Sequence, residues 1–312
     1  MQASALHTFF THLEEQIPAA PNEVRRLFHG RGRYWPGLEQ ITCDWLQGQL
    51  LITVFKEVDD AFKQQLVKGL QELSEQPYWL EKQPTSIVIQ SRYLEGSPCE
   101  VIWGELDDAP VVVESGLKYQ LKIGRNQNFG LFLDMRNGRD WVKANSDGAK
   151  VLNLFAYTCG FSVAAIAGGA KKVVNVDMAR GALNTGRDNH RLNEHDMRSV
   201  DFLGYDIFKS WGKIKKGGPY ELIIIDPPSF QKGSFALTKD YSKILRRLPD
   251  LLTDNGQVLA CVNSPMVEAS FLVDSMMRDA SQIEYKSRLQ NPAEFIDTDS
   301  DSCLKVLLFQ KS

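Results

Sequence analysis

The chain has 312 residues, enough for about two domains with sizeable cores. Hydrophobic residues make up 43% and charged residues 24%, as in ordinary globular proteins, which excludes a disordered, collagen-like or disulfide-scaffold protein. The 36 basic and 39 acidic residues leave a net charge of -3, which excludes binding to nucleic acid by bulk phosphate neutralisation but allows binding through a local patch.

The sequence shows neither a secretory signal nor a membrane-spanning segment. The N-terminal stretch MQASALHTFFTHLEEQ lacks a basic segment followed by an apolar one, and no apolar run is long enough to cross a bilayer. The five cysteines are odd in number and form no C-x-x-C pair, which argues against a disulfide framework and a metal site. We therefore expect a cytoplasmic protein with reduced thiols, no metal and no membrane partner.

Residues 1–115 predict a small α+β domain. Apolar residues at helical spacing predict two helices, one over 2–16 and one capped by Asp59 or Asp60. The segments ITCDWL and LLITVF predict a hairpin between these helices. The remaining elements are short strands, expected at 86–89, 100–103 and 111–114.

Residues 116–312 predict a larger α/β domain. The segments LKYQLKI and NFGLFLD predict a hairpin over 117–134 that turns at Gly124-Arg125-Asn126. After Gly148, the apolar strands KVLNLFAY, KKVVNVDM, ELIIID and QVLACV alternate with helices, which indicates a parallel sheet covered on both faces. The segment CLKVLLFQ predicts a final edge strand. In such a doubly wound sheet the ligand lies beyond the carboxyl ends of the strands.

The first chemical motif is the turn after the strand that ends at Leu154, together with Asp177 at the end of the next strand. The turn reads N-x-F-x-Y-T-C-G, and its single glycine makes it a poor pyrophosphate cradle. The aspartate is placed to accept both hydroxyls of a ribose. These features favour an adenosine ligand without phosphates, S-adenosylmethionine above all; the alternative is an ordinary turn with a structural aspartate. The candidate cofactor residues of the turn are Asn153, Phe155, Tyr157, Thr158 and Gly160.

The second motif, Asp226-Pro227-Pro228-Ser229-Phe230, follows an apolar strand and is more specific. Two prolines remove two N–H donors and hold the chain extended, so that carbonyl groups can face the ligand. Asp226 and these carbonyls can accept hydrogen bonds from a planar nitrogenous group, while Phe230 offers a stacking face. A methyltransferase that acts on a base needs such an arrangement, and a structural turn is the alternative.

A third and weaker motif follows the predicted strand over 200–203. Asp206 could accept a hydrogen bond from the adenine amino group of the cofactor. Asp201 is a rival for this role, and a solvated loop aspartate is the alternative to both.

These stretches resemble the class I S-adenosylmethionine-dependent methyltransferases that modify bases of bacterial large-subunit rRNA, a family with 5-methylcytosine and 7-methylguanine enzymes. The resemblance runs from about Arg26 to the C-terminus and is carried by RLFHGRGRYWPGL, GLFLDMR, LNLFAYTCGFSVAA, VNVDMARGAL and DPPSF. It implies a seven-stranded, mostly parallel, Rossmann-like sheet with S-adenosylmethionine as cofactor and RNA as partner. It also implies that residues 130–136 border the site, which adds Arg136 to the cofactor candidates, and the stretch VNVDMARGAL adds Met178.

The sequence departs from the family in three places. Members often begin with an RNA-binding domain of PUA type, whereas this chain opens with a predicted helix. Cys159 replaces a glycine of the cofactor turn and would narrow it. Cytosine-C5 members carry a Ser-Cys-Ser turn after the fifth strand, and here that turn reads Val262-Asn263-Ser264-Pro265, without a cysteine.

Two basic runs are candidates for contact with RNA phosphates, although such runs are often solvated surface. The first consists of Arg25, Arg26, His29, Arg31 and Arg33, and the second of Lys213, Lys215 and Lys216. The histidines show no metal spacing.

We therefore expect an enzyme that methylates a ring or exocyclic nitrogen of a base in RNA, most simply rRNA, as guanine-N7 enzymes do. The N-terminal domain is the candidate RNA-binding or substrate-binding part. Three alternatives stay open: a cytosine-C5 RNA methyltransferase, a nucleotide-dependent oxidoreductase on the same sheet, and a non-catalytic RNA-binding relative in which Cys159 blocks the cofactor turn.

Overall fold

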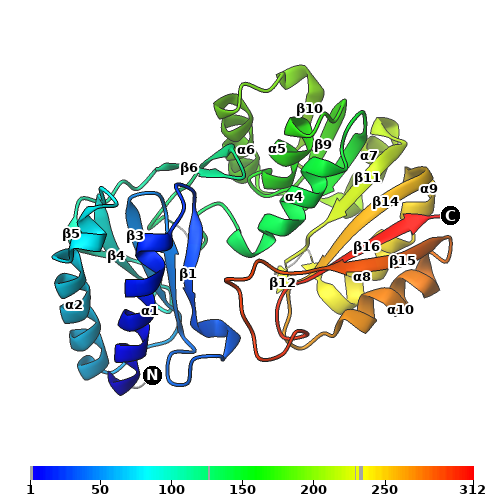
Figure 1. Ribbon diagram of the computed structural model, residues 1–312. Coiled ribbons are helices and arrows are strands. Elements are labelled where there is room, and N and C mark those ends of the chain that lie inside the picture. Colours follow the sequence, from blue (N-terminus) through cyan, green and yellow to red (C-terminus); the bar gives the residue numbers. More distant parts are fainter. Residues whose placement is uncertain (1–2, 126, 229, 232–234) are drawn as a thin grey trace. The chain divides into compact units, whose positions relative to one another are not determined.

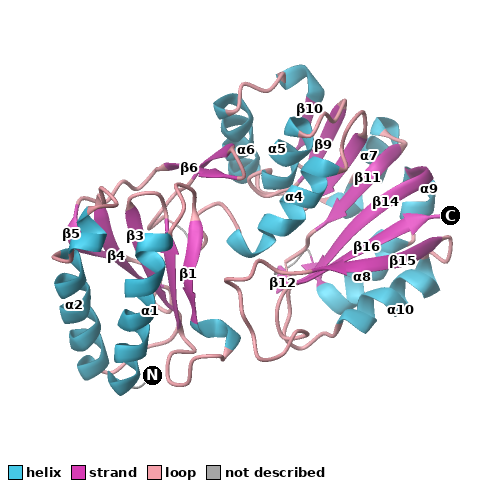
Figure 2. Ribbon diagram, in the orientation of Figure 1, coloured by secondary structure: helices cyan, strands magenta, loops and turns pink. Residues whose placement is uncertain are grey.

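The chain forms two compact units in the computed structural model, which describes residues 3–125, 127–228, 230–231 and 235–312 (Figures 1 and 2). The first unit comprises Met1–Leu133 and Ala293–Asp299, and the second comprises Asp134–Pro292 and Ser300–Ser312. The division therefore falls later in the chain than the predicted boundary after residue 115, and a segment near the C-terminus returns to the first unit.

The first unit is a five-stranded sheet with two long helices packed on it. The sheet has the order β1-β2-β3-β4-β5, in which only β3 and β4 are parallel neighbours. Its elements are η1 (Ala3–Ala5), α1 (Leu6–Ala19), β1 (Arg25–His29), η2 (Gly30–Gly32), β2 (Ile41–Trp45), β3 (Gln49–Val54), α2 (Asp60–Ser74), α3 (Pro77–Leu80), β4 (Ser86–Ser91), β5 (Cys99–Gly104), β6 (Val111–Glu114) and β7 (Leu117–Gln120).

Alternation along the strands builds the core of this unit. Ile41, Cys43 and Trp45 of β2 are buried in one cluster with apolar residues of α1 and α2, because alternate residues of a strand face the same side of the sheet. The expected cap of α2 is present, since the Asp59 carboxylate accepts a hydrogen bond from the Phe62 N–H (2.7 Å). The predicted hairpin of β2 and β3 is confirmed.

The predicted hairpin over 117–134 does not form as a pair of strands in the described residues, although the Lys122 N–H donates to the Phe129 carbonyl (2.8 Å). Asn126 of its predicted turn lies outside the described residues. β7 pairs instead with the preceding strand, β6, through a turn at Ser115 and Gly116, both of which have positive φ. The Val24 N–H donates to the Val113 carbonyl (2.9 Å), which ties this hairpin to the first unit. A glycine at the αL position of a two-residue turn is a stronger hairpin signal than the longer glycine-containing turn on which the prediction rested.

The second unit contains a seven-stranded sheet with helices on both faces (Figure 2). Its elements are η3 (Leu133–Met135, which spans the boundary), α4 (Arg136–Ala144), β8 (Lys150–Leu154), α5 (Gly160–Ala167), β9 (Lys172–Val176), α6 (Arg180–Leu192), η4 (Met197–Ser199), β10 (Val200–Leu203), η5 (Ile207–Lys209), α7 (Trp211–Gly217), β11 (Tyr220–Ile225), β12 (Phe230–Gln231), β13 (Phe235–Ala236), α8 (Leu237–Leu245), α9 (Leu248–Leu251), β14 (Leu252–Val262), α10 (Ala269–Asp279), β15 (Ile283–Leu289) and β16 (Lys305–Lys311).

The strand order β10-β9-β8-β11-β14-β16-β15 confirms the predicted doubly wound sheet. All neighbours are parallel except β16, which is antiparallel to both β14 and β15. The prediction that this last strand lies at the edge is wrong, because β15 pairs with its outer side and forms the edge instead. The direction of winding reverses between β8 and β11. In sheets of this kind the ligand site lies beyond the carboxyl ends of the strands at that reversal.

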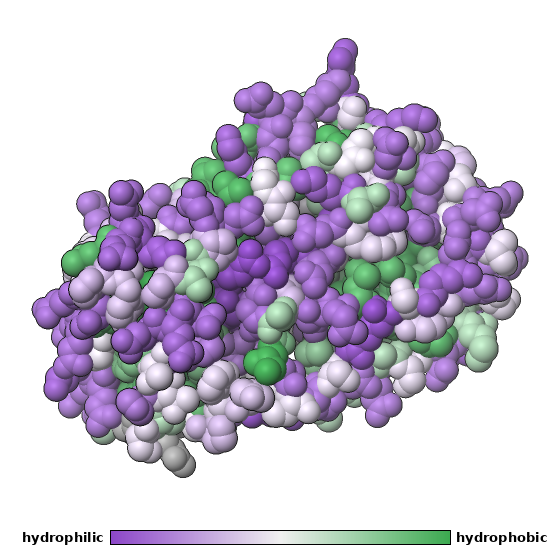
Figure 3. Space-filling model, in the orientation of Figure 1, coloured by the Kyte–Doolittle hydropathy of each residue, from purple (hydrophilic) through white to green (hydrophobic). Residues whose placement is uncertain are grey.

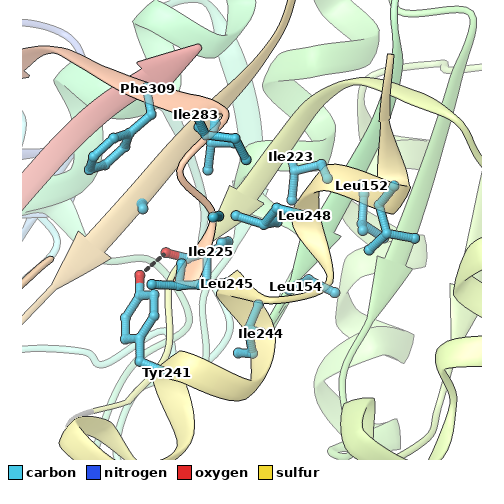
Figure 4. Close-up of a cluster of buried hydrophobic side chains, with 14 of the residues drawn as sticks. Leu152, Leu154, Ile223, Ile225, Tyr241, Ile244, Leu245, Leu248, Ile283 and Phe309 are labelled. Carbon is cyan, nitrogen blue, oxygen red and sulfur yellow. Dashed lines mark hydrogen bonds between the residues drawn. The ribbon is translucent and has the colours of Figure 1, made fainter. Parts of the chain in front are cut away.

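Apolar side chains of β8 and β11 pack beneath this edge. Ile223 and Ile225 are fully buried against α8, α9 and the C-terminal strands (Figure 4). The Tyr241 hydroxyl donates to the carbonyls of Cys261 (3.0 Å) and Ile225 (3.4 Å), so one side chain links the ends of β14 and β11. The end of β11, which precedes the candidate acceptor motif, is therefore held in place by buried packing and by the Tyr241 hydroxyl.

Hydrophilic residues cover most of the face drawn in Figure 3, and apolar residues gather over the strands of the second unit. Among the described helices, none is long and apolar enough to cross a membrane. All five cysteines are free thiols.

Candidate active site

Backbone hydrogen bonds connect the segments after β8, β9 and β10 at the carboxyl edge of the sheet. The Ala156 N–H donates to the Val176 carbonyl (3.2 Å), and the Asp177 N–H donates to the Leu203 carbonyl (3.1 Å). The candidate residues of the first and third motifs therefore lie on neighbouring loops.

The turn after β8 has an unusual backbone. Phe155, Tyr157 and Cys159 all have positive φ, at 58°, 46° and 63°. Each such non-glycine residue costs about 1 kcal/mol or more, and strain of this kind clusters at functional sites. The turn places a compact run of backbone groups before the N-terminus of α5, which begins at Gly160.

Asp177 is held at the centre of this edge. One carboxylate oxygen accepts from the Tyr157 N–H (2.8 Å) and the other accepts from the Ala179 N–H (2.7 Å). The side chain is half-buried. A carboxylate oxygen can accept more than one hydrogen bond, so both oxygens keep capacity for the two hydroxyls of a ribose.

The structure removes the Asn153 side chain from the cofactor candidates. It is 1% exposed and donates to the Asn175 amide oxygen (2.9 Å). The Asn175 amide donates in turn to the Ser162 hydroxyl (2.9 Å), which is bonded to the His190 ring (2.9 Å). Burial and the neighbouring His195 lower the pKa of His190 to about 3, so this chain of contacts is neutral and structural.

Cys159 does not block the turn. Its side chain is fully buried and packs with Ala156, Leu183 and Gly186, where an added Cβ would collide with the Cys159 sulfur. Burial, reinforced by Asp177, raises the pKa of its thiol. The proposed narrowing of the cofactor turn is therefore not supported, because the thiol is directed into the packing between the turn and α6.

The other cofactor candidates separate by position. Asp206 is half-buried after β10 and caps η5 by accepting from the Phe208 N–H (2.8 Å), whereas Asp201 pairs with Lys172 (2.8 Å) at the opposite end of β10. Asp206 is thus the candidate of the two at the ligand edge. The structure places Met178, 45% exposed, directly after Asp177, and Arg136 at the start of α4. Thr158 is buried, and its carbonyl accepts from Asn189 (2.9 Å).

The acceptor motif follows β11. Asp226 is half-buried, Pro227 is buried and Pro228 is exposed. Phe230 begins β12, which pairs with β13. Its side chain and Ser229 lie outside the described residues, so the predicted stacking stays a prediction.

Three neighbours that the sequence analysis did not assign act on Asp226. Burial and then the Asp134 carboxylate raise the pKa of Asp226 to about 7, while Arg139 and a hydrogen bond from the Cys261 thiol act in the opposite direction. Arg139 is buried on α4, and Cys261 is buried on β14. Asp134 lies in the GLFLDMR stretch, so the resemblance already pointed to its segment, whereas Arg139 and Cys261 meet Asp226 only through the fold.

The Cys261 thiol is held in its neutral form. Burial raises its pKa well above the usual range, and the Asp226 and Asp134 carboxylates raise it further. A thiolate beside two carboxyl groups in a buried position is electrostatically disfavoured.

Most of the first basic run is neutralised inside the first unit. Arg26 makes an ion pair with the buried Asp44 (2.5 Å), Arg25 pairs with Glu294 (3.4 Å), and Arg33 pairs with Asp297 (3.2 Å). In the second run, the Lys213 amine lies 3.7 Å from the centre of the Tyr205 ring and Lys215 pairs with Asp250 (3.6 Å). The lysines of the second run are exposed, so this run is surface, whereas most of the first run is paired with acidic groups.

The edge of the sheet carries the features expected for an adenosine ligand. The turn after β8 presents backbone groups, Asp177 follows β9 with its carboxylate held by two backbone N–H groups, and Asp206 follows β10. Together with an antiparallel seventh strand and the acceptor motif after β11, these features define a nucleoside-binding transferase rather than a dinucleotide oxidoreductase.

The family assignment agrees. Residues 25–310 match the S-adenosylmethionine-dependent methyltransferase family, and the chain belongs to it. Its cofactor is S-adenosylmethionine, and the oxidoreductase alternative is set aside.

Named relatives extend the comparison. The chain is 29% identical over 299 residues to "Putative ribosomal RNA large subunit methyltransferase YwbD" of Bacillus subtilis, covering 92% of this chain and 74% of that protein. It is 36% identical over 187 residues to ribosomal RNA large subunit methyltransferase I of Aeromonas hydrophila, covering 58% of this chain and 47% of that protein. The chain thus spans about half the length of the latter relative.

Solved structures share the fold. A "putative SAM-dependent methyltransferase from Streptococcus mutans" superposes with a TM-score of 0.83 at 25% identity, over 97% of this chain and 81% of that chain. The tRNA m1G37 methyltransferase of M. jannaschii superposes with a TM-score of 0.62 at 16% identity, over 90% of this chain and 76% of that chain, a likeness of fold alone.

Proposed function

We propose that this methyltransferase modifies a nitrogen atom of a base in the RNA of the large ribosomal subunit. The RNA class is supported by the names of the relatives, which are ribosomal RNA large subunit methyltransferases. The observation that carries the choice of nitrogen is the environment of Asp226, where the nearby thiol is buried, neutral and surrounded by acidic groups.

Carbon-5 of cytosine is a poor nucleophile until a thiolate adds to carbon-6 of the ring. The Cys261 thiol is hydrogen-bonded to Asp226 of the acceptor motif, and the Asp134 and Asp226 carboxylates both oppose ionisation of this thiol. The turn after β14, where cytosine-C5 members carry a cysteine, has Asn263 and Ser264 instead. Nitrogen attacks a methyl group directly and needs no such thiolate.

S-adenosylmethionine supplies an electrophilic methyl group on a sulfonium. Asp177 and the turn at 155–159 would hold it, with Asp206 as the further candidate. Asp226 and the carbonyls of Pro227 and Pro228 would orient the base by accepting hydrogen bonds from its N–H groups. Where the acceptor is an N–H nitrogen, Asp226 in its ionised form can also take the proton that leaves, because its pKa lies close to neutrality.

Most of the acceleration in this scheme comes from holding the base nitrogen in line with the methyl group, since positioning alone can contribute several kcal/mol. The contact between Tyr241 and the ends of β11 and β14 supports this positioning.

The cytosine-C5 alternative keeps one observation in its favour, namely that the Cys261 thiol does contact Asp226. Incubation with RNA that contains 5-fluorocytosine tests it, because a cysteine adduct on that base cannot resolve. We expect no covalent complex, and Cys261→Ser should keep most of the methylation activity. A covalent complex that disappears in Cys261→Ser would overturn the nitrogen assignment.

A further inference from the structure

One arginine of the first basic run is presented differently from the others. It lies in η2, between Gly30 and Gly32. A Cβ on Gly30 would collide with the Leu38 carbonyl, and one on Gly32 would collide with the Ile296 carbonyl, so both glycines are pressed against backbone. Arg31 between them is exposed. The turn therefore works as a rigid mount that projects one side chain.

Arg31 shares an aromatic platform with a second arginine. Its guanidinium carbon lies 4.3 Å from the centre of the Phe55 ring, and that of Arg92 lies 5.0 Å from the same centre. Arg92 is fixed further by donating to the Asn128 amide oxygen (3.0 Å). The two guanidinium groups therefore contact the same aromatic ring although they lie far apart in the sequence.

The charge of this pair is not compensated. Within the part of the chain that the structure describes, neither Arg31 nor Arg92 has a carboxylate partner, whereas Arg26 beside them is paired with Asp44. Although the Arg31 side chain as a whole is exposed, partial desolvation of its guanidinium group and then Arg26 lower the pKa of Arg31. Burial followed by Arg31 and Arg26 lowers the pKa of Arg92. Holding like charges close together lowers the stability of the folded protein. Such an uncompensated pair of cations is typical of a site that binds an anion.

The neighbouring histidine does not relieve the repulsion. The His29 Nδ1 atom is 2.8 Å from Arg26 Nη1, and burial followed by Arg26 and Arg31 lowers the pKa of His29 to about 3. A neutral imidazole adds no charge and accepts from Arg26, so the uncompensated charge of this cluster lies on the guanidinium groups of Arg31 and Arg92.

We infer that Arg31 and Arg92, mounted on Phe55, form a phosphate-binding site of the first unit that holds the backbone of the RNA substrate. The inference rests on the proposed action on RNA. Guanidinium groups bind phosphate oxygens through directed pairs of hydrogen bonds, and a rigid mount reduces the entropy lost on binding. A phosphate contact of this kind positions the RNA without reading its sequence.

The test measures binding of a fluorescein-labelled single-stranded RNA 20-mer to the full chain at several salt concentrations. Each lost phosphate contact should weaken binding about 5-fold at 0.1 M salt and reduce the slope of log K against log salt by about 0.7. We expect Arg31→Gln and Arg92→Gln each to show this loss, and the double variant about 25-fold. Arg198→Gln, which removes an exposed arginine of the second unit paired with Asp196, is the matched control.

Two further readouts exclude a merely structural role. S-adenosylmethionine affinity should stay unchanged in both variants, and the melting temperature should not fall, because each substitution removes like-charge repulsion. RNA affinity and salt slope equal to those of the wild type would overturn the inference, as would loss of inorganic pyrophosphate binding with unchanged RNA binding, which would indicate a small-anion site. If the wild type neither binds nor methylates RNA, the proposed function itself fails.

Discussion

Asp177 is the residue that we propose to bind the ribose of the cofactor. Its carboxylate joins the turn after β8 to the backbone just before α6. We expect Asp177→Ala to lower S-adenosylmethionine affinity about 100-fold, because two charge-assisted hydrogen bonds of about 1.5–3 kcal/mol each are lost and partly replaced by water. Calorimetry measures this, with Asp188→Ala, an exposed aspartate of α6, as the control. An affinity within a factor of three of the wild type would remove Asp177 from the site.

The raised pKa of Asp226 should lower the stability of the folded protein at neutral and higher pH. Its pKa is about 7 in the folded state, against about 3.9 in an unfolded chain. Between these values the folded state keeps a proton that the unfolded state releases, so stability falls as the pH rises, and the full penalty applies above about pH 7. Asp226→Asn cannot ionise and escapes this penalty.

We therefore expect Asp226→Asn to raise the melting temperature at pH 8 by about 2–8 °C, on the order of 1–2 kcal/mol, and by less at pH 5.5. The same variant should lose methyl transfer while it keeps S-adenosylmethionine affinity. Thermal unfolding of the wild type and of Asp226→Asn at the two pH values measures this difference in melting temperature. A melting temperature lowered by the same amount at both would show that the Asp226 carboxylate stabilises the fold.

At the scale of elements, α6 shapes the cofactor turn through Gly186. An alanine there would collide with the Cys159 sulfur and displace the turn. We expect Gly186→Ala alone to weaken S-adenosylmethionine binding at least 10-fold and to lower the melting temperature. Adding Cys159→Gly to this variant should restore most of the S-adenosylmethionine affinity and most of the melting temperature. This substitution removes the colliding atoms, and glycine adopts the positive φ freely. Additive losses in the double variant would contradict this coupling.

The sequence predicts those elements whose signal lies within a few consecutive residues. The β8 turn, Asp177 and the apolar strands were visible because each is encoded in a few consecutive residues. β1 was missed, since RRLFH is short and its arginines suggested surface, whereas Arg26 is paired with Asp44 of the neighbouring strand. Asp134, Arg139 and Cys261 meet Asp226 from three separate segments, and no local pattern states that they are neighbours.

At the scale of the whole molecule, a late segment of the chain completes the first unit. The Thr298 N–H donates to the Gly32 carbonyl (3.0 Å), and Arg33 pairs with Asp297 (3.2 Å). Because a Cβ at Gly32 would collide with the Ile296 carbonyl, we expect Gly32→Ala to lower the stability of the protein by about 2 kcal/mol or more. Chemical denaturation measures this. Gly181→Ala, whose added Cβ meets nothing within 4 Å, is the control and should be neutral. Equal stability of the two variants would show that the late segment does not hold the turn.

The proposed methylation of a base nitrogen in large-subunit RNA can be measured directly on the product. The most direct measurement incubates the protein with S-adenosylmethionine and protein-free large-subunit rRNA that lacks the modification, then digests the RNA and identifies the methylated nucleoside by mass spectrometry. We expect a nucleoside with the methyl group on a ring or exocyclic nitrogen, and we expect this nucleoside to be absent with Asp226→Asn. Formation of 5-methylcytidine, or no methyl transfer to rRNA by a chain that binds S-adenosylmethionine, would contradict it.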